Sequence, residues 1–98
     1  MAKCFVLRAK IDDASVNVSA TLRGFFGDDK AVELAKKLLN EGAYRMTTGQ
    51  GYIGDAEDSE AVFDALNTSG DSYMTVGDVI VWNNGKRELC LAEGWATI

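Results

Sequence analysis

The sequence predicts an α+β domain, with an antiparallel or mixed sheet of about four to six strands and two helices packed on one face of the sheet. Three observations indicate this class. Two extended runs flank a turn near the C-terminus, strand-like segments lie near the N-terminus, and two amphipathic segments with helical spacing lie between them. The expected element order is β-β-α-β-α-β-β. Because the chain has 98 residues, we expect residues 1–98 to form a single domain.

The C-terminal third of the chain predicts a β-hairpin. Residues 79–81 are all β-branched, and residues 87–91 form a second extended run. Between them, Asn84 and Gly85 tolerate positive φ, which a tight type I′ turn requires. Residues 95–98 are expected to add a last short strand.

The N-terminal segment predicts a second hairpin. Residues 3–11 form a strand candidate, and residues 12–15 have the acidic and small side chains of a turn. Residues 15–22 alternate between apolar and polar side chains, which is typical of a half-exposed antiparallel strand.

The middle of the chain predicts two helices separated by a strand. Asp28 is expected to cap a helix that runs to about Asn40, and Gly42 is expected to end it. A strand candidate follows at residues 43–48. Asp55 is expected to cap a shorter second helix. The expected buried face of this helix consists of Ala61, Val62, Ala65 and Leu66.

Five short motifs, in their order along the chain, carry a resemblance to a group of proteins. They lie at residues 35–38, 42–44, 61–68, 76–80 and 94–98. The last two match an S-x-G-D-(V/I)-(V/I) strand and a closing G-(W/F)-x-x-(I/L), with Thr75 in place of the serine. This order resembles that of small, mostly uncharacterised proteins of phages and conjugative elements. The resemblance implies a mobile-element accessory protein, acting in the host cytoplasm, and it supplies no catalytic residues.

Composition and charge narrow the classes of function. The net charge of −5 argues against direct binding of nucleic acid and against docking on anionic membranes. The longest apolar runs are too short to span a bilayer, so we expect a cytoplasmic protein. Cys4 and Cys90 are expected to be reduced thiols in apolar strands. An acidic protein can instead meet a basic surface on a partner protein.

The absence of histidine argues against an enzyme. It removes the commonest general base, the Ser–His and Cys–His nucleophile pairs and nearly all zinc sites. Hydrolysis by carboxylates alone stays open as an alternative. The acidic clusters lack the spacing of a calcium-binding loop, so we expect no metal and no cofactor.

Exposed aromatic and acidic side chains form the leading candidate site. Phe25, Phe26, Tyr52 and Trp82 could contact a partner protein, because large aromatic side chains are enriched at interface centres. The candidate acidic contacts are Asp55 and Asp58. The leading hypothesis is therefore a non-catalytic inhibitor of a host defence or replication protein that has a basic or apolar surface. Mimicry of nucleic acid by the acidic clusters is a narrower form of it.

A small-ligand site is the alternative hypothesis. Residues 49–54 match G-x-G-x-x-G, which in other contexts cradles a phosphate with backbone N–H groups. Acidic residues follow this loop directly and would repel a phosphate. A nucleotide-binding module or sponge, formed across a homodimer or larger homo-oligomer, could use Arg23, Arg45, Gly49 and Gly51, with Lys30 nearby in sequence.

Overall fold

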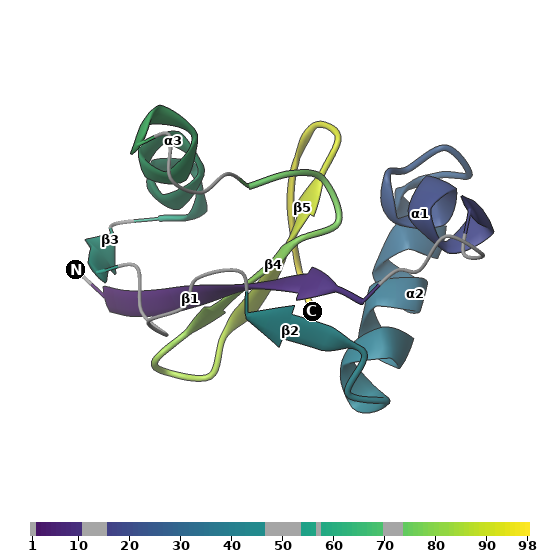
Figure 1. Ribbon diagram of the computed structural model, residues 1–98, viewed down its shortest axis with the longest axis horizontal. Helices are drawn as coiled ribbons and strands as arrows, with labels where there is room; N and C mark the ends of the chain where they lie inside the picture. The colour runs from purple at the N-terminus through teal and green to yellow at the C-terminus, as the bar shows by residue number, and fades with distance from the viewer. Residues whose placement is uncertain (1, 11–15, 47–53, 57, 70–73) are drawn as a thin grey trace.

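The computed structural model describes residues 2–10, 16–46, 54–56, 58–69 and 74–98. Within these residues the chain forms one antiparallel sheet and three helices, so the predicted α+β class is confirmed (Figure 1). The observed order is β-α-α-β-β-α-β-β-β. The elements are β1 (Ala2–Ala9), α1 (Val16–Leu22), α2 (Asp28–Asn40), β2 (Tyr44–Met46), β3 (Gly54–Ala56), α3 (Ser59–Ser69), β4 (Val79–Trp82), β5 (Arg87–Leu91) and β6 (Gly94–Thr97).

Strand β1 organises the sheet. The strand order is β2-β1-β4-β5-β6, and the short β3 also pairs with β1. On one edge, Phe5 of β1 lies opposite Val81 of β4. On the other edge, β2 pairs with the C-terminal half of β1 and β3 pairs with its N-terminal half. The predicted strand at residues 3–11 is therefore confirmed in its main part.

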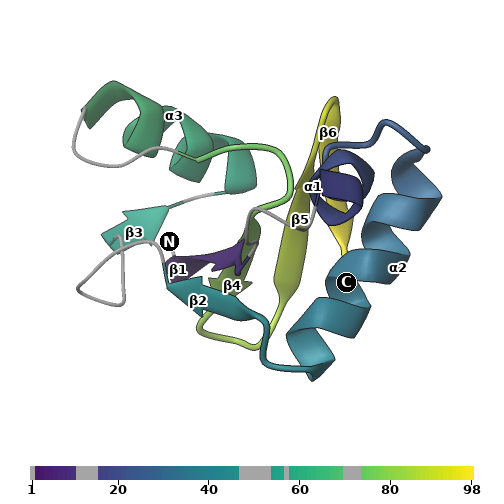
Figure 2. The ribbon, with the colours of Figure 1, turned by 45° about the vertical axis from the view of Figure 1, so that its right-hand side comes forward.

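The helices cover both faces of the sheet, which differs from the prediction of two helices on one face. Helix α3 lies on one side, while α1 and α2 lie on the other (Figure 2). Alternation along β1 divides the core accordingly, because Cys4 and Val6 pack in the cluster with α3 and Ala9 packs in the cluster with α1 and α2. The unbroken apolar run of β4 reflects this burial on two faces.

Residues 16–22 form helix α1, so the prediction of a strand at residues 15–22 is wrong, and with it the N-terminal hairpin. Seven residues with apolar side chains at every second position also place Val18 and Leu22 four residues apart, on one helical face. Leu22 is buried in the cluster that contains Ala31 and Ala35 of α2. Contact with α2 thus decides between two periodicities that this short segment satisfies equally.

Helix α2 spans the predicted residues, but its first cap differs. Gly27 is the N-cap residue and Asp28 is the first helical residue. At the other end, Gly42 has φ +70°, its N–H donates to the Leu39 carbonyl, and the next N–H donates to the Leu38 carbonyl. These two bonds form a Schellman motif, as the predicted glycine ending requires.

Helix α3 begins three residues later than predicted. Asp58, not Asp55, caps it, since the Asp58 Oδ1 accepts a hydrogen bond of 2.9 Å from the Ala61 N–H. Asp55 lies in β3. Val62 and Leu66 are buried as predicted, whereas Ala65 is exposed.

The C-terminal hairpin of β4 and β5 is confirmed, with a different turn, and β6 completes the sheet as predicted. Among the described residues only glycines have positive φ, and Gly85 has φ +91°. The Gly85 N–H donates to the Trp82 carbonyl, and the Trp82 N–H donates to the Lys86 carbonyl. This is a three-residue loop closed by a glycine, rather than the two-residue type I′ turn.

Candidate anion-binding pocket

One end of the sheet carries a cavity of about 570 Å³, which we call the basic pocket. It lies among the end of β1, helix α1, strand β2 and the turn that precedes β4. Among the residues that the structure describes, four cationic side chains and one carboxylate line it, together with two hydroxyl groups and several small or apolar residues. The lining residues are Arg8, Lys10, Arg23, Arg45, Asp78, Ser19, Thr75, Ala9, Leu22, Val76 and Gly77.

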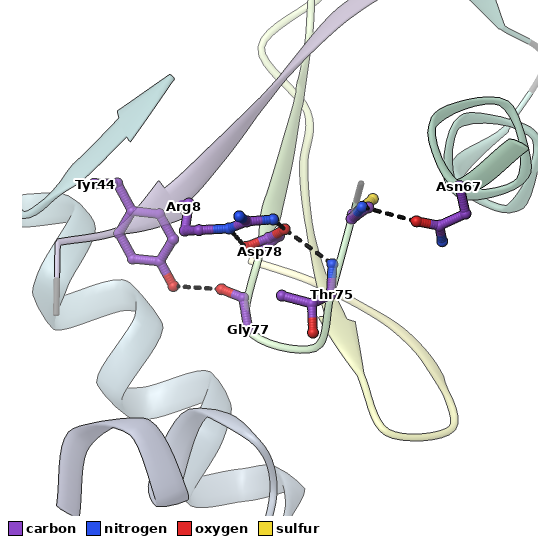
Figure 3. Close-up of polar contacts among 7 residues, drawn as sticks. Arg8, Tyr44, Asn67, Thr75, Gly77 and Asp78 are labelled. Carbon is purple, nitrogen blue, oxygen red and sulfur yellow. Dashed lines mark hydrogen bonds and ion pairs between the residues drawn. The ribbon is translucent and has the colours of Figure 1, made fainter. Parts of the chain in front are cut away.

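A partly buried ion pair forms one wall of the basic pocket. The Arg8 guanidinium donates from Nε to Asp78 Oδ1 at 3.1 Å and from Nη2 to Asp78 Oδ2 at 2.9 Å (Figure 3). The Thr75 N–H also donates to Asp78 Oδ2, at 3.0 Å. The Asp78 side chain is only 2% exposed and that of Arg8 is 25% exposed. Asp78 therefore fixes and neutralises Arg8, and its oxygens are already engaged.

The turn at residues 75–78 is held tightly against its neighbours. The Asp78 N–H donates to the Thr75 carbonyl, and Gly77 between them has φ +95°, as a type II turn requires. The Gly77 carbonyl accepts a hydrogen bond of 2.9 Å from the buried Tyr44 hydroxyl, and the Gly77 N–H donates to the Cys90 carbonyl. The turn is thus fastened to β2 and β5.

The other cations of the basic pocket come from three separate segments. Arg45 of β2 lies directly opposite Arg8 in the β1–β2 ladder. Arg23 follows the last turn of α1, where a cation is favourable beside the negative end of the helix dipole. Lys10 follows β1, and its Nζ donates to the Gly42 carbonyl at 3.4 Å. Lys10, Arg23 and Arg45 are exposed to solvent.

Burial strengthens the preference of the Cys90 thiol and the Tyr44 hydroxyl, which lie near Asp78, for their protonated forms. Burial, followed by the nearby Asp78 carboxylate, raises the pKa of Cys90 to about 11. The same two causes, in the same order, raise the pKa of Tyr44. Tyr44 is therefore a neutral hydrogen-bond donor to Gly77, and Cys90 is a buried thiol rather than a reactive thiolate.

The residues predicted for a small ligand are partly brought together. Arg23 and Arg45 line the same cavity, although 22 positions separate them in the sequence. Lys30 is exposed on α2 and does not line the cavity. Gly49 and Gly51 lie outside the described residues.

Among the described residues, those predicted for partner binding do not form one surface. Phe25 and Phe26 are 73% and 57% exposed, in the turn between α1 and α2. Asp58 is exposed, but it caps α3 on the opposite face of the sheet. Asp55 lies in β3, and Tyr52 lies outside the described residues.

Trp82 corrects the expectation of an exposed aromatic side chain beside the hairpin turn. It is 6% exposed, belongs to the core cluster under α3, and donates from Nε1 to Glu88 Oε1 at 3.2 Å. The alternation of β4 explains this, because Trp82 projects to the same face as Ile80, and that face is covered. Trp82 is therefore not available to a partner protein.

Sequence reasoning missed Arg8, Lys10 and Asp78. Arg8 could have indicated the site, because it lies within an apolar strand and shares a face with Cys4 and Val6. A cation at such a position requires a buried partner. Its partner Asp78 lies 70 residues away, and only the pairing of β1 with β4 identifies it.

Further observations concern membranes and metals. In the part of the chain that the structure describes, no helix has the length and apolar character needed to cross a membrane. Within the same residues, no three or more side chains of the metal-ligating types form a group.

Comparison with known proteins adds no family. The chain matches no protein-family model, no curated protein and no solved structure.

Proposed function

We propose that this protein is a non-catalytic binding protein that holds a small phosphate-bearing molecule in the basic pocket. The observation that carries the proposal is the meeting of Arg8, Arg45 and Arg23 at one cavity. Asp78 compensates the charge of Arg8, whereas Arg23 and Arg45 form no ion pair with another of the described residues. An anionic ligand would compensate these two charges.

The chemistry of the cations supports a phosphate group. The guanidinium fork matches two phosphate oxygens at once and remains charged at all physiological pH values. A single exposed ion pair contributes less than about 1 kcal/mol, so a useful affinity requires several cations to contact one ligand. A cavity lined by cations from different segments meets that requirement, whereas the same cations scattered on a surface would not.

Substitution of the exposed arginines tests this proposal. We expect Arg23→Gln and Arg45→Gln each to weaken binding of ATP by about three- to fivefold, which corresponds to about 0.6–1 kcal/mol. Lys30→Gln is the matched control, because it removes an exposed cation outside the pocket and should change affinity less than about twofold. Isothermal titration calorimetry at low salt measures the affinities, and circular dichroism checks that each variant is folded.

The same experiment can contradict the proposal. Wild-type protein that is not stabilised by millimolar ATP or pyrophosphate in a thermal-shift assay would refute it, because a ligand that binds the folded state must raise its stability. Equal losses of affinity in the two arginine variants and in Lys30→Gln would place any binding outside the pocket.

A second candidate function rests on the exposure of Phe25 and Phe26, which are 73% and 57% exposed. On this proposal the protein is an accessory factor of a phage or mobile element, and it blocks a host protein in the host cytoplasm. The adjacent phenylalanines would insert into an apolar surface of that protein.

Pull-down from host lysate tests the second candidate. Wild-type protein should recover a stoichiometric partner that the double variant Phe25→Ser, Phe26→Ser loses. Met46→Ser is the control, because Met46 is also exposed, at 52%, and lies in β2. Recovery of only a second copy of this chain would indicate a homodimer instead, and recovery of nothing would count against the candidate.

A further inference from the structure

We infer that the ligand of the basic pocket is a nucleoside diphosphate or triphosphate, rather than a monophosphate or an inorganic polyphosphate. This inference rests on the proposed function and adds the class of ligand. It combines the charge that remains in the pocket after the Arg8–Asp78 pair is formed with the size and lining of the rest of the cavity.

The charge of the pocket calls for more than one phosphate group. Asp78 neutralises Arg8, which leaves Lys10, Arg23 and Arg45 as the cations of the cavity. None of these three forms an ion pair with another of the described residues. A phosphate monoester carries a charge of about −1.5 to −2 near neutral pH, so a single group leaves part of this excess uncompensated. A second phosphate group supplies the missing charge.

The segments that supply the cations also favour a ligand with more than one phosphate group. Lys10 follows β1, Arg23 follows α1 and Arg45 lies in β2, so they approach the cavity from three separate segments. Each arginine can hold two oxygens of one phosphate in its planar fork, and a lysine adds a point charge. A chain of two or three phosphates presents separate groups to cations that are arranged in this way.

The remainder of the cavity fits an organic body. Its volume of about 570 Å³ lies in the range of about 300–1,000 Å³ that is typical of small-molecule sites. Ala9, Leu22 and Val76 supply apolar surface, and Ser19 and Thr75 supply hydroxyl groups beside it. A sugar with an attached base offers both hydroxyl groups and an apolar face. An inorganic polyphosphate offers neither and would leave this part of the lining without contacts.

Calorimetry with a series of ligands tests the inference in magnesium-free buffer at low salt, so that no cation masks the phosphates. The probes are AMP, ADP, GDP, ATP and pyrophosphate. We expect the tighter of ADP and GDP to bind at least tenfold more tightly than AMP, and at least tenfold more tightly than pyrophosphate. Lys10→Gln should reduce the preference for ADP over AMP. Val76→Ala should weaken ADP binding and leave pyrophosphate binding unchanged.

The outcomes separate the inference from the proposed function. If pyrophosphate or AMP binds as tightly as both nucleoside diphosphates, and Arg45→Gln abolishes that binding, the pocket binds anions and the inference is wrong. If none of the probes binds, or if Arg23→Gln and Arg45→Gln leave binding unchanged, the proposed function itself is wrong.

Discussion

At the scale of single residues, the Arg8–Asp78 pair is the most constrained feature of the pocket. Asp78 is almost fully buried and accepts two hydrogen bonds from Arg8 and one from the Thr75 N–H. The free energy needed to remove two charges from water offsets much of their mutual attraction, so such a pair adds little net stability. Its effect here is to orient Arg8 and to hold the 75–78 turn beside the cavity.

Removal of the Asp78 charge should be costly even though the pair itself adds little. We expect Asp78→Asn to lower the free energy of unfolding by about 2–4 kcal/mol, because the mostly buried Arg8 guanidinium loses the carboxylate that it contacts with two hydrogen bonds. Urea denaturation at neutral pH measures the change. Lys86→Gln is the control, because it breaks the more exposed pair of Lys86 with Glu88, at 3.6 Å, and should cost less than about 1 kcal/mol. Similar losses in the two variants would show that Asp78 does not compensate Arg8.

The sequence allowed only part of this site to be predicted. Arg23 and Arg45 were identified as ligand cations from residue type, and both line the pocket. Arg8 and Asp78 could not be paired in advance, because their contact depends on which edge of β1 faces β4 and in which register. A position in the sequence determines neither of these.

At the scale of elements, segments whose signals agree were predictable, whereas a short segment that fits two periodicities was not. The 13 residues of α2 carry an apolar stripe, acidic residues in the first turn and a closing glycine, all of which indicate the same helix. The seven residues of α1 fit two periodicities, and only their contact with α2 selects the helix. The unbroken apolar run of β4 indicates that both faces of the sheet are covered. The prediction did not use this signal and placed both helices on one face.

At Gly77, both the backbone conformation and the packing of a neighbouring side chain favour glycine. Its φ of +95° is unfavourable for any other residue, and a Cβ atom there would lie 3.2 Å from the Cβ of the buried Leu22. Gly85 has a similar φ, +91°, but a Cβ atom there would have no neighbour within 4 Å. A comparison of substitutions at the two glycines therefore distinguishes the cost of backbone strain from the cost of crowding.

We expect Gly85→Ala to lower the free energy of unfolding by about 1–2 kcal/mol, which is the cost of the left-handed backbone alone. Gly77→Ala should cost about 1–3 kcal/mol more, because the added methyl group must displace α1 or the 75–78 turn. Chemical denaturation of the two variants measures the difference. Equal losses would show that the turn can move away from α1 without cost.

At the scale of the whole molecule, the basic pocket stands out against an acidic protein. The chain has 15 acidic and 10 basic residues, yet among the described residues four basic side chains and one acidic side chain line this cavity. Such a distribution attracts an anion at short range and repels it at long range. It suits a small anion, which can enter the cavity, better than a long polyanion, which would also lie against the acidic surface.

Salt should therefore weaken binding of a nucleoside diphosphate, despite the net charge of −5. The Debye length is about 10 Å at 0.1 M salt, so repulsion from distant carboxylates is already screened at moderate ionic strength, and additional salt mainly weakens the contacts in the pocket. We expect the dissociation constant for ADP to rise about three- to tenfold between 50 and 500 mM sodium chloride. Arg45→Gln should show a smaller rise, and Lys30→Gln should match the wild type. An affinity that does not change with salt would mean that apolar contacts, rather than the cations of the pocket, hold the ligand.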